Sequence, residues 1–165
     1  MDDNKIIHVD TKVVDKAIKT IEEKFGNMPQ TRGDKHDFLG MNIKFKENKV
    51  KIRMKKHIQK VTDTVMDDIT RKAVSLTTRY LFKTSEAAKL TKEKPENFHS
   101  VVASLLFISR RCRLDIQTAG ALLCTRVAEP DKDDWKRLKR VLQYLRGIIN
   151  IVQTLGADNI TKMKL

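Results

Sequence analysis

Two adjacent carboxylates stand at the start of the chain, in the stretch MDDNKIIHVD. Asp2 and Asp3 follow the first methionine and precede a short apolar run that is typical of a β-strand. Adjacent carboxylates supply oxygen ligands of the kind that divalent cations bind. The pair is therefore either a solvated tail or part of a site whose preceding residues are missing.

The densest cluster of cations is formed by Arg110, Arg111 and Arg113, which follow an apolar stretch with helical character. Cations suit the last turn of a helix because they interact favourably with its dipole. The same side chains can also bind phosphates. Farther along, Lys136 and Arg140 lie off the apolar stripe of a second helix, on a face that is either simply solvated or binds a polyanion.

The composition indicates a basic globular chain. Its 165 residues include 34 Lys and Arg against 21 Asp and Glu, which gives a net charge of +13. Such an excess favours nucleic acid as partner, ahead of an anionic membrane. The apolar run 101–109 is far shorter than the ~20 residues of a membrane span. We expect an intracellular protein, cytoplasmic or nuclear, without a membrane partner, in which Cys112 and Cys124 are free core thiols.

The first part of the chain predicts a mixture of strands and one helix. A strand over 4–10 precedes a helix over 11–25 that Gly26 ends, and 28–35 forms a strand and turn. Two alternating stretches, 37–45 and 49–54, then predict a hairpin with one buried side and one basic side.

After residue 56 the pattern becomes helical. We expect a helix striped by Ile58, Val61, Val65 and Ile69, and the further helices listed here: a short one over 85–93, an apolar one over 97–113 with Asn97 as N-cap, one over 115–130, and one over 131–147. The predicted fold class is α+β: residues 1–56 form an α+β part, 57–150 a helical bundle, and 151–165 a linker.

The order of these motifs resembles the reverse transcriptase of copia-type retrotransposons. The paired aspartates, the helix and the FLGM hairpin are similar to the end of that family's polymerase palm. FHSVVASLLFISRRCRLDIQTAGALLCTR and DDWKRLKRVLQYLRG are similar to its helical thumb, and LGADN resembles the link to a ribonuclease H domain. Where the family usually has proline in Arg-Pro-Asp-Ile, this chain has Leu114, so we expect a looser turn there.

The resemblance implies roles for the first two aspartates. In the family, an aromatic-x-Asp-Asp turn carries catalytic metal ligands, so Asp2 would bind Mg2+ directly and Asp3 would assist. Two metal ions would activate the primer 3′ hydroxyl and neutralise the triphosphate. A further aspartate and the nucleotide-binding fingers would come from sequence before this chain. The resemblance thus predicts a fragment of an RNA-directed DNA polymerase that needs a missing N-terminal half.

The resemblance also implies residues that bind a template-primer, which is an RNA–DNA or DNA duplex. Leu39, Gly40, Met41 and Asn42 match the hairpin that grips the primer, where glycine allows a sugar-phosphate backbone to come close. Alternatively, Leu39 and Met41 are plain core residues and Gly40 marks a bulge. The arginine cluster with Lys136 and Arg140 would contact phosphates of the duplex.

Two alternatives to a polymerase fragment remain open at the level of sequence. One is a non-catalytic, basic nucleic-acid-binding remnant. The other is a start assigned at an internal methionine of a longer reading frame.

Overall fold

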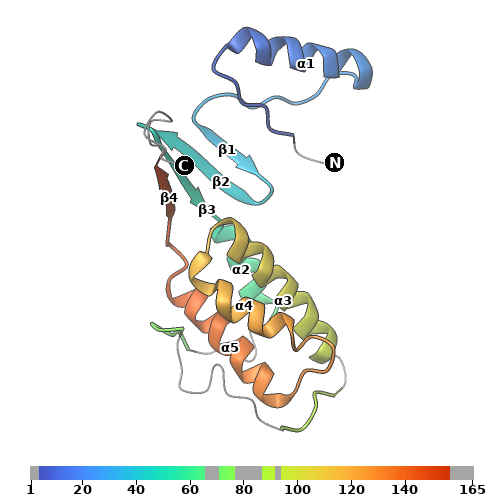
Figure 1. Ribbon diagram of the computed structural model, residues 1–165, viewed down its shortest axis with the longest axis vertical. Helices are drawn as coiled ribbons and strands as arrows, with labels where there is room; N and C mark the ends of the chain where they lie inside the picture. The colour runs from blue at the N-terminus through green and yellow to red at the C-terminus, as the bar shows by residue number, and fades with distance from the viewer. Residues whose placement is uncertain (1–3, 66–70, 77–86, 92–93, 157–165) are drawn as a thin grey trace, which may run out of the picture.

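The computed structural model describes residues 4–65, 71–76, 87–91 and 94–156, and it confirms a mixed α+β fold for them (Figure 1). Four antiparallel strands form one sheet in the order β1-β2-β3-β4. The strands are β1 (Lys35–Phe38), β2 (Met41–Lys46), β3 (Lys49–Arg53) and β4 (Gln153–Gly156). The helices are α1 (Thr11–Phe25), α2 (Lys55–Asp63), α3 (Lys94–Arg111), α4 (Gln117–Cys124) and α5 (Lys132–Gly147), with a 3-10 helix, η2 (Leu114–Ile116).

The main hydrophobic core lies between α2, α3, α4 and α5, which gather below the sheet in Figure 1. Phe98 of α3 is 0% exposed and its ring centroid lies 6.5 Å from that of Trp135 in α5. The apolar stripe predicted for the last helix consists of Trp135, Leu138, Leu142, Leu145 and Ile149. The first four are buried in α5, whereas Ile149 lies beyond the end of this helix and is only partly buried. Helical periodicity therefore located the inner face of α5. The stripe predicted from Ile58 to Ile69 is shorter than expected, because α2 ends at Asp63 and the buried Val65 lies beyond it.

The predicted hairpin is confirmed, but the stretch 37–45 is not one strand. Leu39 and Gly40 both have positive φ angles, 47° and 74°, and form a two-residue turn between β1 and β2. Such turns match the twist of antiparallel strands, and glycine adopts a positive φ without steric cost. The chain thus makes an additional turn inside the stretch that the alternation of apolar residues predicted as one strand.

The sheet packs on the helical core through its apolar face. Met41 and Ile52 contact the core cluster, and the Cys112 thiol at the end of α3 donates a hydrogen bond to the Ile52 carbonyl at 3.5 Å. Cys112 is buried, Cys124 is half-buried, and both are free as predicted. Burial raises the pKa of the Cys112 thiol above its ordinary value, so it stays protonated and able to donate this bond. The sheet and the bundle are thereby joined at the C-terminal end of α3.

The strand predicted over 4–10 is not formed in the described residues 4–10. A strand needs a neighbour to pair its backbone groups, and none of the described strands pairs with this stretch, where Ile7 is 73% and Val9 100% exposed. Helix α1 is confirmed and ends before Gly26, yet it buries none of its residues. Phe25 is 77% exposed. The apolar side chains at the start of the chain are therefore largely without partners among the described residues.

Several predicted boundaries in the helical part are corrected. Helix α3 begins at Lys94, with Pro95 in its first turn, so Asn97 is not its N-cap. The helix predicted over 115–130 ends at Cys124, because the following residues form a loop held by side-chain contacts to α5. Residues 87–91 are not helical, and Lys89 forms an isolated bridge with Asp131.

The predicted linker contains a strand. Residues 153–156 form β4, which pairs with β3 and leads the chain back to the sheet after α5 (Figure 1). The open edge of β3 provides the hydrogen bonds that this short segment cannot make by itself. The rest of the predicted linker, 157–165, and Ile69 lie outside the described residues.

Candidate nucleic-acid interface

The turn at Leu39 and Gly40 projects at the end of the sheet that faces α2. Leu39 has a φ of 47° although it is not glycine, and its side chain is 40% exposed. A left-handed conformation costs such a residue about 1–2 kcal/mol, and residues held in this way concentrate at functional sites. Asn42, one strand residue farther on, donates its amide N–H to the Asp37 carboxylate at 3.0 Å.

Gly40 lies against the beginning of α2. A Cβ atom built on this glycine would lie 3.9 Å from Nδ1 of His57 and 4.0 Å from Cε of Met54. The His57 ring in turn packs on Phe107 of α3, with the ring centroids 5.2 Å apart. The guanidinium carbon of Arg111 lies 3.8 Å from the centroid of the Phe107 ring, on its face.

Gly40 thus lies near His57, and the contacts from His57 through Phe107 to Arg111 lead from the hairpin turn to the basic end of α3. The structure therefore brings together two groups of predicted site residues, the turn around Gly40 and the pair Arg110 and Arg111. Arg110 is exposed and Arg111 is half-buried against Phe107. A guanidinium stacked on a ring loses less side-chain freedom when it binds a phosphate.

His57 lies in the middle of this series, between Gly40 and Phe107. It was not among the predicted site residues. Its Nε2 atom is buried and has no hydrogen-bond partner among the described residues. Burial, followed by the positive charge of Lys60, lowers the pKa of His57 below its ordinary value. The ring is consequently neutral near pH 7 and acts here as a packing group between Gly40 and Phe107.

The phosphate contact predicted for Arg113 is contradicted by its burial. This side chain is 1% exposed, and its guanidinium donates two hydrogen bonds to the Asp115 carboxylate, at 2.9 Å and 2.7 Å. Tyr144 donates its hydroxyl to the same carboxylate at 2.9 Å. Burial alone would raise the pKa of Asp115, but the bonds from Arg113 and Tyr144 outweigh it and lower the pKa below its ordinary value.

The turn that contains Leu114 is well defined and not loose as expected. Leu114 is the first residue of η2, a helical position that also suits proline. The pair Arg113 and Asp115 on either side of it fixes this turn between α3 and α4. Here the arginine is a structural residue.

Lys136 lies away from the turn and from Arg110. Lys136 follows Trp135, which packs against Phe98 near the start of α3. Arg110 is twelve residues after Phe98 (98 to 110), or ~18 Å along the helix axis. Lys136 is exposed and forms an ion pair with Asp133 at 2.8 Å, whereas Nε of Arg140 is buried and has no hydrogen-bond partner among the described residues. The predicted basic residues thus do not form one cluster.

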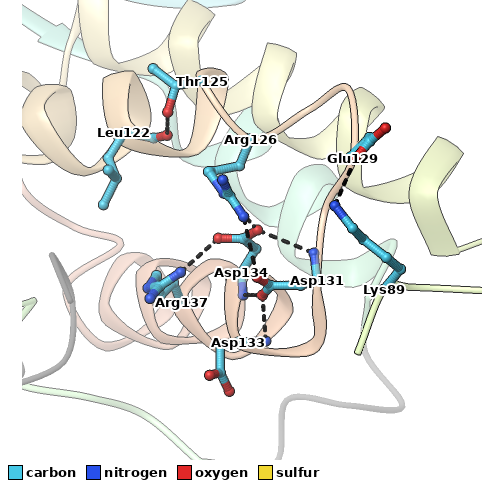
Figure 2. A network of polar contacts seen from close by, with 9 residues as sticks. All are labelled: Lys89, Leu122, Thr125, Arg126, Glu129, Asp131, Asp133, Asp134 and Arg137. Carbon is cyan, nitrogen blue, oxygen red and sulfur yellow. Dashed lines mark hydrogen bonds and ion pairs between the residues drawn. The ribbon is translucent and has the colours of Figure 1, made fainter. Parts of the chain in front are cut away.

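A dense charge network at the start of α5 has a structural role (Figure 2). Asp134 is 0% exposed and lies between Arg126, at 3.0 Å, and Arg137, at 2.6 Å. Asp131 caps the helix by accepting hydrogen bonds from the backbone N–H groups of Asp133 and Asp134. The Asp134 carboxylate accepts one from the Asp131 backbone N–H, which completes a capping box. All the buried acceptors of this network face donors of the chain itself.

The predicted metal site cannot be located in the structure, because Asp2 and Asp3 lie outside the described residues. Within the described ranges, no group of three or more His, Cys, Asp or Glu side chains could hold a metal ion. In the same part of the chain, none of the helices combines the length and the apolarity needed to cross a membrane.

Comparison with known proteins gives a distant similarity. The chain is 29% identical over 119 residues to the uncharacterized mitochondrial protein AtMg00810 of Arabidopsis thaliana. The matched region covers 71% of this chain and 48% of that protein, so the chain spans about half the length of this relative. No protein-family model matches the chain. No solved structure matches it either.

Proposed function

We propose that this chain derives from a retrotransposon and corresponds to the C-terminal palm and thumb portion of a copia-type reverse transcriptase. Its task in that assembly is to hold the template-primer duplex during RNA-directed DNA synthesis. The motif order, the net charge of +13 and the distant plant relative support a transposon-related origin. The palm and thumb assignment rests on the motif order and on the arrangement of the hairpin turn and α3.

The observation that carries the proposal is the series of contacts from Gly40 through His57 and Phe107 to Arg111. The absence of a side chain on Gly40 lets the turn lie close to His57 and Met54 at the start of α2, which brings the turn near the end of α3. Arg110 and Arg111, at the adjacent end of α3, supply the positive charge that a sugar-phosphate backbone attracts. A site of this type holds a duplex through its phosphates and is indifferent to base sequence.

The catalytic part of the proposal concerns Asp2 and Asp3. As carboxylates they suit Mg2+, which prefers oxygen ligands and completes its coordination with water and phosphate. In the intact polymerase they would share the ion with a further aspartate. When bound, the metal ions would lower the energy of phosphoryl transfer to the primer 3′ hydroxyl, with release of pyrophosphate.

A second candidate function is nucleic-acid binding without catalysis. It is favoured by the interface itself, since the contacts among Gly40, His57, Phe107 and Arg111 need no metal ion. Primer extension separates the two candidates. Because two carboxylates alone make a poor Mg2+ site, we expect this chain by itself not to extend a primer on an RNA template. Extension that depends on Mg2+ and that Asp2→Asn abolishes would contradict this expectation.

The duplex-holding role predicts a specific salt dependence. Fluorescence anisotropy with a labelled RNA–DNA hybrid, over roughly 50 to 200 mM salt, gives the slope of log affinity against log salt concentration. The double variant Arg110→Ala/Arg111→Ala is expected to reduce the magnitude of this slope by about two, at roughly 0.9 per phosphate contact. Hybrids of different sequence should weaken equally.

The matched control is Lys12→Ala/Lys16→Ala, which removes the same charge from exposed positions of α1. This control should retain the slope of the parent. An arginine variant with unchanged affinity and slope would show that the end of α3 does not contact the duplex. An equal loss in the control would show that only the total charge matters.

A further inference from the structure

One face of the four-stranded sheet carries mostly cations. Residues directly opposite each other in antiparallel strands project from the same face. The registers of β1, β2 and β3 therefore place six exposed cations together: Lys35, Lys44, Lys46, Lys49, Lys51 and Arg53. We call this the basic sheet face. These paired strands also place one carboxylate, Asp37, on the basic sheet face. Asp37 accepts the hydrogen bond from Asn42.

The cations of the basic sheet face are opposed to one another. Lys44 pairs directly with Lys51, and Lys46 with Lys49. Like charges in such positions destabilise a sheet. In the described part of the chain, one of these four lysines forms an ion pair. It is Lys46, whose partner Glu47 lies 3.3 Å away in the turn between β2 and β3. Folding alone would favour opposite charges at these positions.

Protection of a sheet edge does not explain this arrangement. Lysines on edge strands prevent other chains from pairing there. However, β2 and β3 are the two inner strands, since the order is β1-β2-β3-β4. The repulsion between Lys44 and Lys51 is instead relieved when a polyanion lies across the strands.

We propose that the basic sheet face binds the phosphate backbone of a nucleic-acid duplex, in addition to the contact at the hairpin turn. The choice of nucleic acid as the ligand rests on the proposed function. The choice of this surface does not, because no cation of the basic sheet face takes part in the contacts from Gly40 to Arg111. The face begins beside the turn, with Arg53 opposite Asn42. A duplex can therefore extend from one surface onto the other.

The geometry favours a duplex over a single strand. Neighbouring strands lie about 4.8 Å apart, and side chains on one face recur every ~6.8 Å along a strand. The cations thus form a two-dimensional array. Binding of single strands relies on exposed aromatic rings on which bases stack. The aromatic side chains of these strands, His36, Phe38 and Phe45, project from the opposite face, because they alternate with the cations.

The test compares Lys44→Gln/Lys51→Gln with the control Lys12→Gln/Lys16→Gln of equal charge. The labelled probes are an RNA–DNA hybrid, a single-stranded DNA of equal length, and vesicles containing phosphatidylserine. We expect the parent to prefer the hybrid, and the variant to lose roughly tenfold or more in hybrid affinity, with a slope smaller by about two. The control should resemble the parent. Thermal unfolding of the variant should occur at the same or a higher temperature, because a repulsion is removed.

Each other outcome is decisive. A variant that binds the hybrid like the parent overturns the proposal and shows a merely solvated face. Parent binding that is as tight to the single strand, or tighter to the vesicles, overturns the choice of a duplex. If Lys44→Gln/Lys51→Gln loses hybrid affinity and Arg110→Ala/Arg111→Ala does not, the basic sheet face binds the duplex and the end of α3 does not. If only the arginine variant loses affinity, the end of α3 binds the duplex and the basic sheet face does not. No hybrid binding by the parent even at low salt contradicts both proposals.

Discussion

Replacement of Phe98 by alanine is expected to lower the free energy of unfolding by about 3–5 kcal/mol. The side chain is 0% exposed and packs on Trp135, where the first turns of α3 and α5 meet. Its removal eliminates apolar contacts and leaves a cavity that the surrounding helices cannot fully close. Because a domain of this size is stable by only about 5–15 kcal/mol, the variant should be close to unfolding at room temperature. Urea unfolding followed by circular dichroism measures the change.

Phe25→Ala is the matched control for this prediction. Phe25 has the same side chain at the end of α1 but is 77% exposed. Its replacement should change the free energy of unfolding by less than ~0.5 kcal/mol, as is usual for surface positions. Comparable effects of the two substitutions would show that α1 is packed in solution, against this chain or another copy of it. The comparison thus tests whether the stable core resides in the helical bundle.

Replacement of Asp134 by alanine is expected to lower the free energy of unfolding by about 3 kcal/mol. Asp134 is 0% exposed and accepts hydrogen bonds from Arg126 and Arg137, and from the Asp131 backbone N–H group (Figure 2). Removing it leaves the largely buried Arg137 without this partner and breaks the capping box of α5. Removing one partner of a buried ion pair destabilises a protein by more than the pair itself contributes to stability, because the other charge stays buried without a partner. Thermal and urea unfolding both report the loss.

The control is Asp133→Ala, on the same turn of the same helix. Asp133 is 30% exposed and its ion pair with Lys136 lies at the surface. Its loss should cost less than ~1 kcal/mol, because surface pairs and the interaction with the helix dipole are both weak. The free energy of unfolding of Asp134→Asn should lie between those of Asp133→Ala and Asp134→Ala, since asparagine keeps the shape of the side chain and removes its charge. Equal stabilities of the Asp133 and Asp134 variants would contradict the structural role assigned to the network.

Helices and turns with strong local signals were predictable. The stripe that includes Leu138 and Leu142 fixed the inner face of α5, and the helix predicted over 131–147 begins at the residue that caps it, Asp131, because helix periodicity and capping depend on neighbouring residues only. Gly26 as the end of α1 follows the same logic. The alternation in 37–45 and 49–54 located the hairpin of β2 and β3 and its basic side, although it did not predict the turn at Leu39 and Gly40.

Pairing and burial at a distance were not predictable in this way. Residues 4–10 have the composition of a strand but form none, because a strand exists only with a partner. Residues 153–156 have a weak signal and still form β4, because β3 has a free edge there. His57 was not assigned to the interface, since its role depends on Gly40 and Phe107, which are far from it in sequence.

The sequence by itself determined the α+β class, the inner face of α5 and the basic character of the chain. The tertiary structure decided which cations are available to a partner. Arg110, Arg111 and Arg113 are equivalent in sequence, yet Arg113 is buried against Asp115 and Arg111 stacks on Phe107. The reason is physical: charge is a property of a residue, whereas accessibility and pairing arise only when the α3 end, η2 and α5 pack together.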